Sequence, residues 1–171
     1  MNLNRSNLIL IGMPGCGKTT IGKEAAKHMH MKFIDLDKLI EKREGKSINE
    51  IFIKGETYFR SLESDIIAEL CNVKDTVIST GGGVVKKACN MELLNDIGFI
   101  VFINRNVDSI LKDIDTESRP LLNNKSDALY KLYNERIELY KGYCHAELEN
   151  DGTLEQILTE IISIYKGSVK L

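Results

Sequence analysis

The segment from Gly12 to Thr19 reads GMPGCGKT and fits the pattern G-x-x-x-x-G-K-[ST] of a phosphate-binding loop. Its glycines allow a tight turn and a close approach to a phosphate, and its successive N–H groups point toward the anion. Lys18 would reach the β- and γ-phosphates, and the Thr19 hydroxyl would bind Mg²⁺. An apolar run before the loop and a helical pattern after it favour a nucleoside triphosphate site over an ordinary glycine-rich turn. The residues assigned to the nucleotide here are Gly12, Gly15, Cys16, Gly17, Lys18, Thr19 and Thr20.

Two aspartates, Asp35 and Asp37, come at the end of a second apolar run that predicts a strand. Residues two apart project from the same face of a strand, so both carboxylates are expected to face the loop. One would bind Mg²⁺ through water, and the other would hold an acceptor hydroxyl and take its proton. The alternative for Asp37 is the N-cap of the following short helix, which is compatible with a role in the site.

Arg60 and Glu63 lie three residues apart in an expected helix and are therefore neighbours on one face. They are either an exposed ion pair of little consequence or an arginine fork that grips an anion and is oriented by the glutamate. Gly81, Gly82 and Gly83 directly follow another expected strand. Because three glycines lose much backbone entropy on folding, we expect a ligand to lie against this bare backbone, with a tight structural turn as the alternative.

A polar segment, Asp115–Ser126, separates two expected helices and contains Arg119. Such a segment suits a lid that excludes water, where Arg119 would stabilise charge on a transferring phosphoryl group; the alternative is a solvated arginine. Arg136 lies within a helix among aromatic residues, where it either stacks on a ring or forms a second anion clamp. Lys112 either lies beside the nucleotide base or is solvated.

The elements that must position these residues alternate between strands and helices. Apolar runs predict strands at Leu8–Ile11, Lys32–Leu36, Thr76–Ser79 and Phe99–Ile103, with Ala146–Leu148 as an edge strand. Helical spacing is expected over Lys18–Met29, Asp37–Glu44, Ile48–Ile53, Glu56–Leu70, Lys86–Asn95, Val107–Ile114, Asp127–Tyr143 and Leu154–Tyr165. This order predicts a parallel sheet covered on both faces, with ligands bound beyond the carboxyl ends of the strands.

Composition excludes several classes of protein. The 171 residues suit one domain, and 23 basic against 25 acidic residues give no bulk attraction to nucleic acid or anionic membranes. No run approaches the roughly 18 apolar residues of a membrane helix, and no secretory signal is apparent.

The spacing of Cys16, Cys71, Cys89 and Cys144 fits no zinc site and predicts reduced thiols in a cytoplasmic protein. Cys16 is the exception, because a thiol in a glycine-rich loop can differ in pKa and access from a core cysteine. The lack of a coiled-coil heptad favours a monomer.

Taken together, the motifs resemble the shikimate kinase family over nearly the whole chain. The matching segments are Gly12–Thr19, Asp35-Leu36-Asp37, Phe59-Arg60 followed by Glu63, Ser79–Gly83, Arg119–Leu122, and Arg136 ahead of Leu139-Tyr140. The resemblance implies a three-layer α/β/α P-loop kinase with a five-stranded parallel sheet, a substrate-binding subdomain at about 35–63 and a lid at about 115–126. It also implies ATP- and Mg²⁺-dependent phosphorylation of the 3-hydroxyl of shikimate, a step of aromatic amino acid biosynthesis.

The resemblance further implies roles for individual residues. Arg60, Arg136 and the backbone at Gly82 would hold the shikimate carboxylate, and Glu63 would orient Arg60. Gly81 and Gly83 would also contact the substrate. Asp37 would bind the ring hydroxyls as the candidate base, and Lys18 and Arg119 would act on the phosphates. Asp35 and Ser79 would arrange the Mg²⁺ shell through water beside Thr19. Lys112 stands where family members often have an arginine that stacks on adenine, and Glu149–Thr153 lacks the basic residue often found there, so the base contacts are expected to differ.

Three other activities compete with this interpretation. A nucleoside monophosphate kinase binds two highly charged substrates and would need several lid arginines, but the segment has only Arg119. A gluconate-type kinase also takes a carboxylated polyol; the glycine triplet and the pair Arg60 and Arg136 favour a rigid ring acid instead. A nucleotide-dependent switch is disfavoured because every expected catalytic position is filled.

Overall fold

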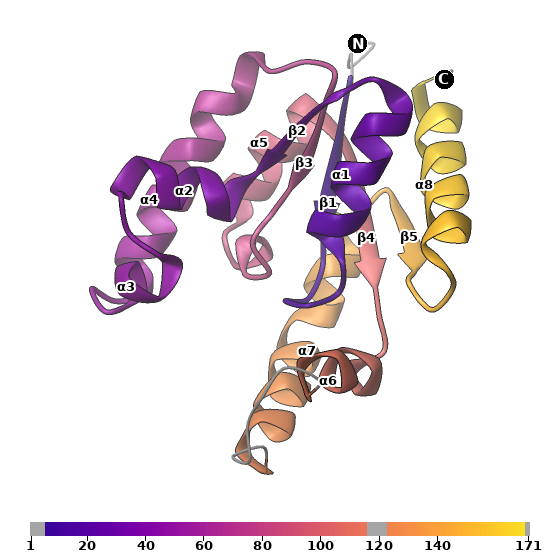
Figure 1. Cartoon of the computed structure of the whole chain (residues 1–171). Coiled ribbons are helices and arrows are strands. Elements are labelled where there is room, and N and C mark those ends of the chain that lie inside the picture. Colours follow the sequence, from indigo (N-terminus) through magenta and orange to yellow (C-terminus); the bar gives the residue numbers. More distant parts are fainter. Residues whose placement is uncertain (1–5, 116–122, 170–171) are drawn as a thin grey trace.

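The structure is a computed structural model that describes residues 6–115 and 123–169 (Figure 1). The strands are β1 (Asn7–Ile11), β2 (Lys32–Asp35), β3 (Thr76–Ser79), β4 (Gly98–Asn104) and β5 (Ala146–Glu149). The helices are α1 (Lys18–Met29), α2 (Leu36–Glu44), α3 (Ile48–Phe52), α4 (Glu56–Glu69), α5 (Ala88–Ile97), α6 (Val107–Asp115), α7 (Asn123–Tyr143) and α8 (Leu154–Val169). Two short 3₁₀ turns, Leu70–Asn72 and Val84–Lys86, precede β3 and α5.

The five strands form one parallel sheet in the order β2-β3-β1-β4-β5, which confirms the expected architecture. β1 lies in the centre, and all five of its residues are buried because both neighbouring strands and both helical layers cover it. β2 and β5 form the two edges. Since every strand runs in the same direction, all the carboxyl ends meet at one edge of the sheet, where a site can be assembled.

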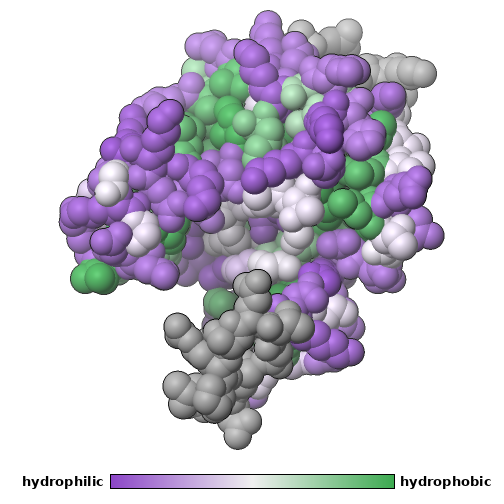
Figure 2. Space-filling view, in the orientation of Figure 1, coloured by the Kyte–Doolittle hydropathy of each residue, from purple (hydrophilic) through white to green (hydrophobic). Residues whose placement is uncertain are grey.

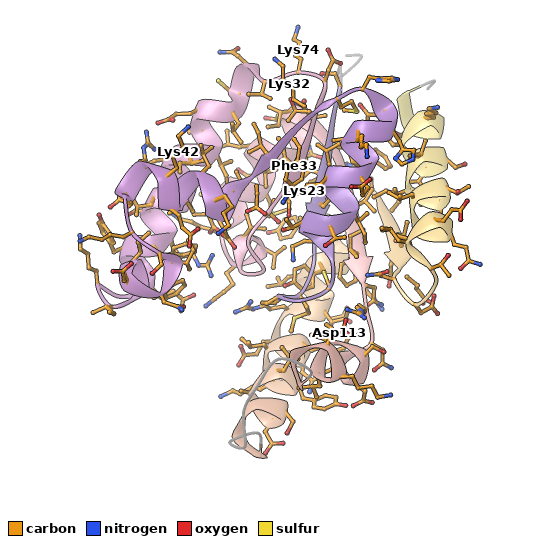
Figure 3. The ribbon with its side chains drawn as sticks, viewed as in Figure 1. Lys23, Lys32, Phe33, Lys42, Lys74 and Asp113 are labelled. Atoms are coloured by element: carbon orange, nitrogen blue, oxygen red, sulfur yellow. The ribbon has the colours of Figure 1, made fainter. Side chains whose placement is uncertain are left out.

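Helices cover both faces of the sheet. In Figure 1, α1 and α8 lie side by side on the near face, and α5 lies behind the sheet. Phe33 of β2 fixes the position of α1: a Cβ atom on Gly22 would lie 2.8 Å from the Phe33 ring, so only glycine admits this close contact (Figure 3). Helices α2, α3 and α4 form a group beside β2, whereas α6 and the first half of α7 project away from the sheet at its carboxyl edge.

The observed boundaries differ from the expected ones where a turn intervenes. A helix was expected from Lys86, but the N–H groups of Val84 and Lys86 bond back to the carbonyls of Gly81 and Gly83, which makes a tight turn, and α5 begins at Ala88. Part of the polar segment expected between α6 and α7 is helical, because α7 begins at Asn123. The α1 and β3 boundaries agree with expectation.

The visible surface is mostly hydrophilic, with apolar residues reaching it in only a few places (Figure 2). Among the described residues, no helix is both long enough and apolar enough to cross a membrane. Large apolar side chains of the described residues are exposed at the end of α3, where Phe52 and Ile53 are neighbours, and singly on α5 and α8 at Leu93 and Leu154.

Candidate active site

The phosphate-binding loop joins buried strand β1 to helix α1, and its glycines are required by the backbone conformation. Gly12, Gly15 and Gly17 have φ angles of 147°, 79° and 99°, which other residues rarely adopt. A Cβ atom on Gly12 would also lie 2.5 Å from the carbonyl oxygen of Ile103. No side chain of the described residues caps the first turn of α1, so its free N–H groups face the loop. The loop and the helix dipole thus offer donors to an anion.

Lys18 is buried, and its ammonium group lies inside the loop. Lys18 Nζ donates to the carbonyl oxygens of Gly12 at 2.9 Å and Met13 at 2.8 Å, and lies 3.6 Å from Cys16 Sγ. Burial of an ammonium is unfavourable unless it has such partners. The bonds therefore hold a positive charge where an anion cradled by the loop would meet it.

Thr19 and Asp35 supply neighbouring oxygens. Thr19 Oγ1 donates to Asp35 Oδ2 at 2.7 Å, and Asp35 Oδ1 accepts the backbone N–H of Lys38 at 3.2 Å. Asp35 is thus the N-cap of α2. The alternative in which Asp37 is the N-cap is wrong, because β2 ends at Asp35 and the helix begins at Leu36. A hydroxyl beside a carboxylate suits Mg²⁺, which usually keeps several waters and binds phosphate oxygens. No group of three or more His, Cys, Asp or Glu side chains in residues 6–115 and 123–169 forms a metal cage by itself.

A cavity of about 430 Å³ opens at the carboxyl edge of the sheet, next to the loop. Asp37 lies in the first turn of α2 rather than on a strand, so helix geometry brings it to the cavity beside Asp35. The cavity is lined by Pro14, Gly15, Gly17, Lys18, Thr19, Thr20, Asp35, Asp37, Ser79, Thr80 and Gly82. Expected nucleotide, metal and acceptor residues therefore share one space.

The Asp37 carboxyl is perturbed by its surroundings. Burial raises its pKa above the ordinary 3.8, and the nearby Asp35 carboxylate raises the pKa further, whereas Lys18 and Arg60 oppose the shift. Asp37 Oδ1 has no hydrogen-bond partner among the described residues. A carboxyl with a raised pKa and an unused oxygen can accept a hydrogen bond, and then a proton, from a hydroxyl.

Arg60 and Glu63 form an ion pair on α4 that is not a surface pair. Arg60 Nη1 donates to Glu63 Oε2 at 2.7 Å, and Glu63 is fully buried while the Arg60 side chain is 15% exposed. Burial raises the pKa of the Glu63 carboxyl, and Arg60 opposes that shift. Arg60 Nε also donates to Glu56 Oε1 at 3.4 Å. The two glutamates thus hold Nε and Nη1, and Nη2 is left for an anion.

Close contacts with neighbouring groups explain why the three positions of the triplet are glycines. A Cβ atom on Gly81 would lie 2.8 Å from Asp37 Oδ1 and 3.2 Å from Glu63 Oε1. At Gly83 it would lie 1.9 Å from Arg60 Nη2. At Gly82 it would lie 2.6 Å from Pro14 Cδ in the phosphate-binding loop. Each glycine thus makes room for a different part of the site, and the triplet joins the two carboxyls, the guanidinium and the loop.

Arg136 reaches the triplet from α7. It is 8% exposed, and its Nη1 donates to the carbonyl oxygen of Gly82 at 3.1 Å. Its Nε is buried without a partner among the described residues. Tyr140, one turn further along α7, also donates to the Gly82 carbonyl. Tyr140 belongs to the motif Leu139-Tyr140, and its spacing of four residues from Arg136 in a helix was the signal that both share a face.

Two further residues, which the sequence motifs did not indicate, contact the phosphate-binding loop from the ends of β5 and β4. Asn150 follows β5, and its Nδ2 donates to the Cys16 carbonyl at 2.8 Å. Arg105 follows β4, and its Nη1 approaches the Gly15 carbonyl at 3.4 Å and Asp113 Oδ2 at 2.6 Å. Both could have been found because each directly follows a strand at the same sheet edge. Asp113 lies on α6, in the projecting part of the molecule (Figure 3).

Several expected site residues are not among those that line the cavity: Gly12, Cys16, Arg60, Gly81, Gly83, Lys112 and Arg136. Arg119 lies outside the described residues. Lys112 lies on α6 and is exposed.

Comparisons with known proteins agree with this geometry. The family model for shikimate kinase matches residues 14–166. A shikimate kinase of Clostridium botulinum (strain Alaska E43 / Type E3) is 46% identical over 160 residues, which cover 94% of this chain and 97% of the relative. The chain belongs to the shikimate kinase family.

Solved structures of shikimate kinases share the fold. The Acinetobacter baumannii shikimate kinase in complex with shikimate superposes with a TM-score of 0.87 at 32% identity, covering 96% of this chain and 94% of that one. A Sinorhizobium meliloti gluconokinase superposes with a TM-score of 0.65 at 14% identity, over 98% of this chain and 95% of that one, and shows the common fold alone. The shikimate kinases are therefore the nearer relatives by both measures.

Proposed function

We propose that this chain transfers the γ-phosphoryl group of ATP to the 3-hydroxyl of shikimate in the cavity described above. Membership of the shikimate kinase family supports the acceptor. The observation that supports the assignment of the site is that the phosphate-binding loop and half-buried Asp37 line one cavity together with Gly82. Arg136 donates to the Gly82 carbonyl, and Arg60 lies close against neighbouring Gly83.

On the nucleotide side, we assign the phosphates to the loop backbone and to Lys18, whose ammonium would exchange carbonyl partners for phosphate oxygens. Thr19 would bind Mg²⁺ directly, and Asp35 and Ser79 would hold its water ligands. Bound Mg²⁺ would neutralise charge on the β- and γ-phosphates. The Thr19–Asp35 contact of 2.7 Å fits this donor set, because hydroxyl and carboxylate oxygens are the ligands that Mg²⁺ prefers.

On the acceptor side, Arg60 and Arg136 would bind the carboxylate, and Asp37 would accept a hydrogen bond from the reacting hydroxyl and then its proton. Forked guanidinium donors match a planar carboxylate, and a carboxylate acceptor matches a polyol. Residues 35–63 would form the substrate-binding subdomain. Residues 115–126, with Arg119, would form a lid that contacts phosphate. The chain would act as a cytoplasmic monomer, which the four free cysteines and the scattered apolar surface residues support.

The test is acceptor-dependent ADP release with Mg-ATP, comparing shikimate, gluconate and a nucleoside monophosphate. We expect release with shikimate alone. Arg136→Ala should weaken shikimate binding by roughly 1.5–3 kcal/mol, the size of a lost charged hydrogen bond. Lys131→Ala, an exposed cation on the same helix, is the matched control and should change nothing. Release with gluconate but not shikimate would contradict the proposed acceptor, and unchanged affinity in Arg136→Ala would contradict the clamp.

A further inference from the structure

The carbonyl oxygen of Gly82 accepts two hydrogen bonds, and both donors come from α7. One is Arg136 Nη1 at 3.1 Å, and the other is the Tyr140 hydroxyl. A carbonyl oxygen has two lone pairs, so both are in use. Gly82 is also the glycine that contacts the phosphate-binding loop through Pro14. Its peptide therefore lies at the junction of the nucleotide and acceptor sides.

The Tyr140 hydroxyl is held firmly in place. The residue is fully buried, and its ring stacks on Phe102 of β4 with 5.0 Å between centroids and 15° between planes. Its hydroxyl oxygen lies 3.9 Å from Met13 Sδ in the loop. Burial raises the pKa of Tyr140 to about 12, so the hydroxyl stays protonated and can donate at neutral pH. It is thus a permanent donor to the Gly82 carbonyl.

Arg136 differs from Tyr140 because it has a second use. Its guanidinium bonds the Gly82 carbonyl, yet its Nε has no partner among the described residues although it is buried. Such an arrangement suits an anion that takes over the guanidinium. If the carbonyl then had no other donor, it would be left unpaired in a half-buried site, which is unfavourable.

We propose that Tyr140 is a positioning residue of the acceptor site, whose hydroxyl keeps the Gly82 carbonyl bonded so that Arg136 can exchange this carbonyl for the carboxylate of the acceptor. The inference rests on the proposed role of Arg136 in binding that carboxylate. It assigns to Tyr140 an effect on acceptor affinity that passes through Arg136 alone.

The experiment is a double-mutant cycle read by calorimetric titration with shikimate and, separately, with Mg-ADP. Tyr140→Phe keeps the ring on Phe102 and removes only the hydroxyl. We expect its shikimate Kd to rise about five- to twentyfold, with the Mg-ADP Kd and kcat within about twofold of wild type. Tyr143→Phe, three residues further along the same helix and half-buried, is the matched control and should match wild type.

The second arm introduces Tyr140→Phe into Arg136→Ala. There the hydroxyl has no guanidinium to release, so its removal should no longer change the shikimate Kd. An equal loss in both backgrounds, or no loss in the single variant, would overturn the proposal and leave Tyr140 a packing residue. If Arg136→Ala by itself left the shikimate Kd unchanged, the proposed binding of the carboxylate by Arg136 would be contradicted, and so would the role of Tyr140 that depends on it. Thermal unfolding of each variant separates these effects from lost stability.

Discussion

At the scale of single residues, the main chemical feature of the site is that Asp37 and Glu63 both lie close to Gly81. Each has one buried oxygen without a partner among the described residues, and both oxygens lie near the position that a Gly81 side chain would fill. Burial raises the pKa of both carboxyls, so the folded chain holds protons there more tightly than the unfolded chain does. The site therefore keeps two acids in an environment that opposes their ionisation. This lowers the stability of the folded chain, so the two acids are explained by function rather than by stability.

Because the pKa of Asp37 is raised, replacing this residue should have opposite effects on stability and on activity. Ionised Asp37 opposes folding at pH above its raised pKa, and this penalty is relieved as the pH falls from that pKa toward the ordinary 3.8. Asp37→Asn should therefore raise Tm at neutral pH, by about 2–4 °C for each kcal/mol gained, while kcat falls about 10²- to 10⁴-fold. In wild type, activity should decline toward low pH at a higher pH than an ordinary aspartate would give.

Scanning calorimetry and a pH–rate profile check this prediction. Asp65→Asn, at an exposed position of α4, is the control and should leave both quantities unchanged. A kcat of Asp37→Asn near wild type would remove Asp37 from the reaction, and a lower Tm would show that its carboxylate stabilises the fold.

Gly83 gives a second prediction at this scale. A methyl group there would lie 1.9 Å from Arg60 Nη2, so Gly83→Ala must push the guanidinium away from its position beside Glu63. We expect the KM for shikimate to rise at least tenfold, since a charged hydrogen bond is worth roughly 1.5–3 kcal/mol, with the Mg-ADP affinity kept. Steady-state kinetics measure this.

Gly142→Ala on α7 is the matched control, because nothing lies within 4 Å of its position. Alanine is favoured over glycine in a helix by about 1 kcal/mol, so this variant should be as stable as wild type or more stable. A similar KM in both glycine variants would contradict the contact between Gly83 and Arg60.

At the scale of elements, the phosphate-binding loop depends on segments far along the chain. The turn after β5 reaches it through Asn150, whose side chain bonds the Cys16 carbonyl and whose backbone N–H bonds the Asn104 carbonyl at 2.7 Å. A Cβ atom on Gly17 would lie 2.8 Å from Asn150 Nδ2, so the glycine also makes room for this contact. The loop is thus held by the turn after β5 as well as by its own strand and helix.

Asn150→Ala tests this brace. Loss of the bond to Cys16 should cost about 0.5–1.5 kcal/mol and weaken Mg-ADP binding about two- to tenfold, because the loop must then be ordered by the nucleotide. Shikimate affinity should stay unchanged. Asn104→Ala is the control, since its side chain bonds only exposed Glu147 in the described structure, at 2.8 Å. Calorimetric titration measures both affinities, and equal effects of the two variants would contradict the brace.

At the scale of the whole molecule, the nucleotide and acceptor sides are built on different parts of the fold. The loop, α1 and the turn after β5 form the first, and α2, α4 and the end of α7 form the second (Figure 1). They meet at the carboxyl edge of the sheet through the glycine triplet. The two ligands should therefore stabilise the folded chain separately, and each contribution should be removable by itself.

Ligand-induced shifts of Tm test this separation. Mg-ADP at 100 times its Kd should stabilise the chain by about 2.7 kcal/mol. Lys18→Ala should lose this shift but keep the shift caused by shikimate. Lys23→Ala, an exposed lysine on the same helix, should keep both (Figure 3). A full Mg-ADP shift in Lys18→Ala would contradict the assignment of Lys18 to the phosphates.

Several local parts of this protein can be predicted from its sequence alone. Backbone preferences and periodicity within a few residues are enough to predict the phosphate-binding loop, the helix Lys18–Met29 and the strand Thr76–Ser79. These preferences do not depend on contacts with distant parts of the chain. The parallel sheet follows from the alternation of strands and helices. Four features are visible only in the folded chain: the strand order, the role of Asp35 as a cap, the burial of Glu63, and the hydrogen bonds of Tyr140 and Arg136 to one carbonyl. These depend on close contacts between segments distant in the chain, and such contacts leave no periodic signal in the sequence.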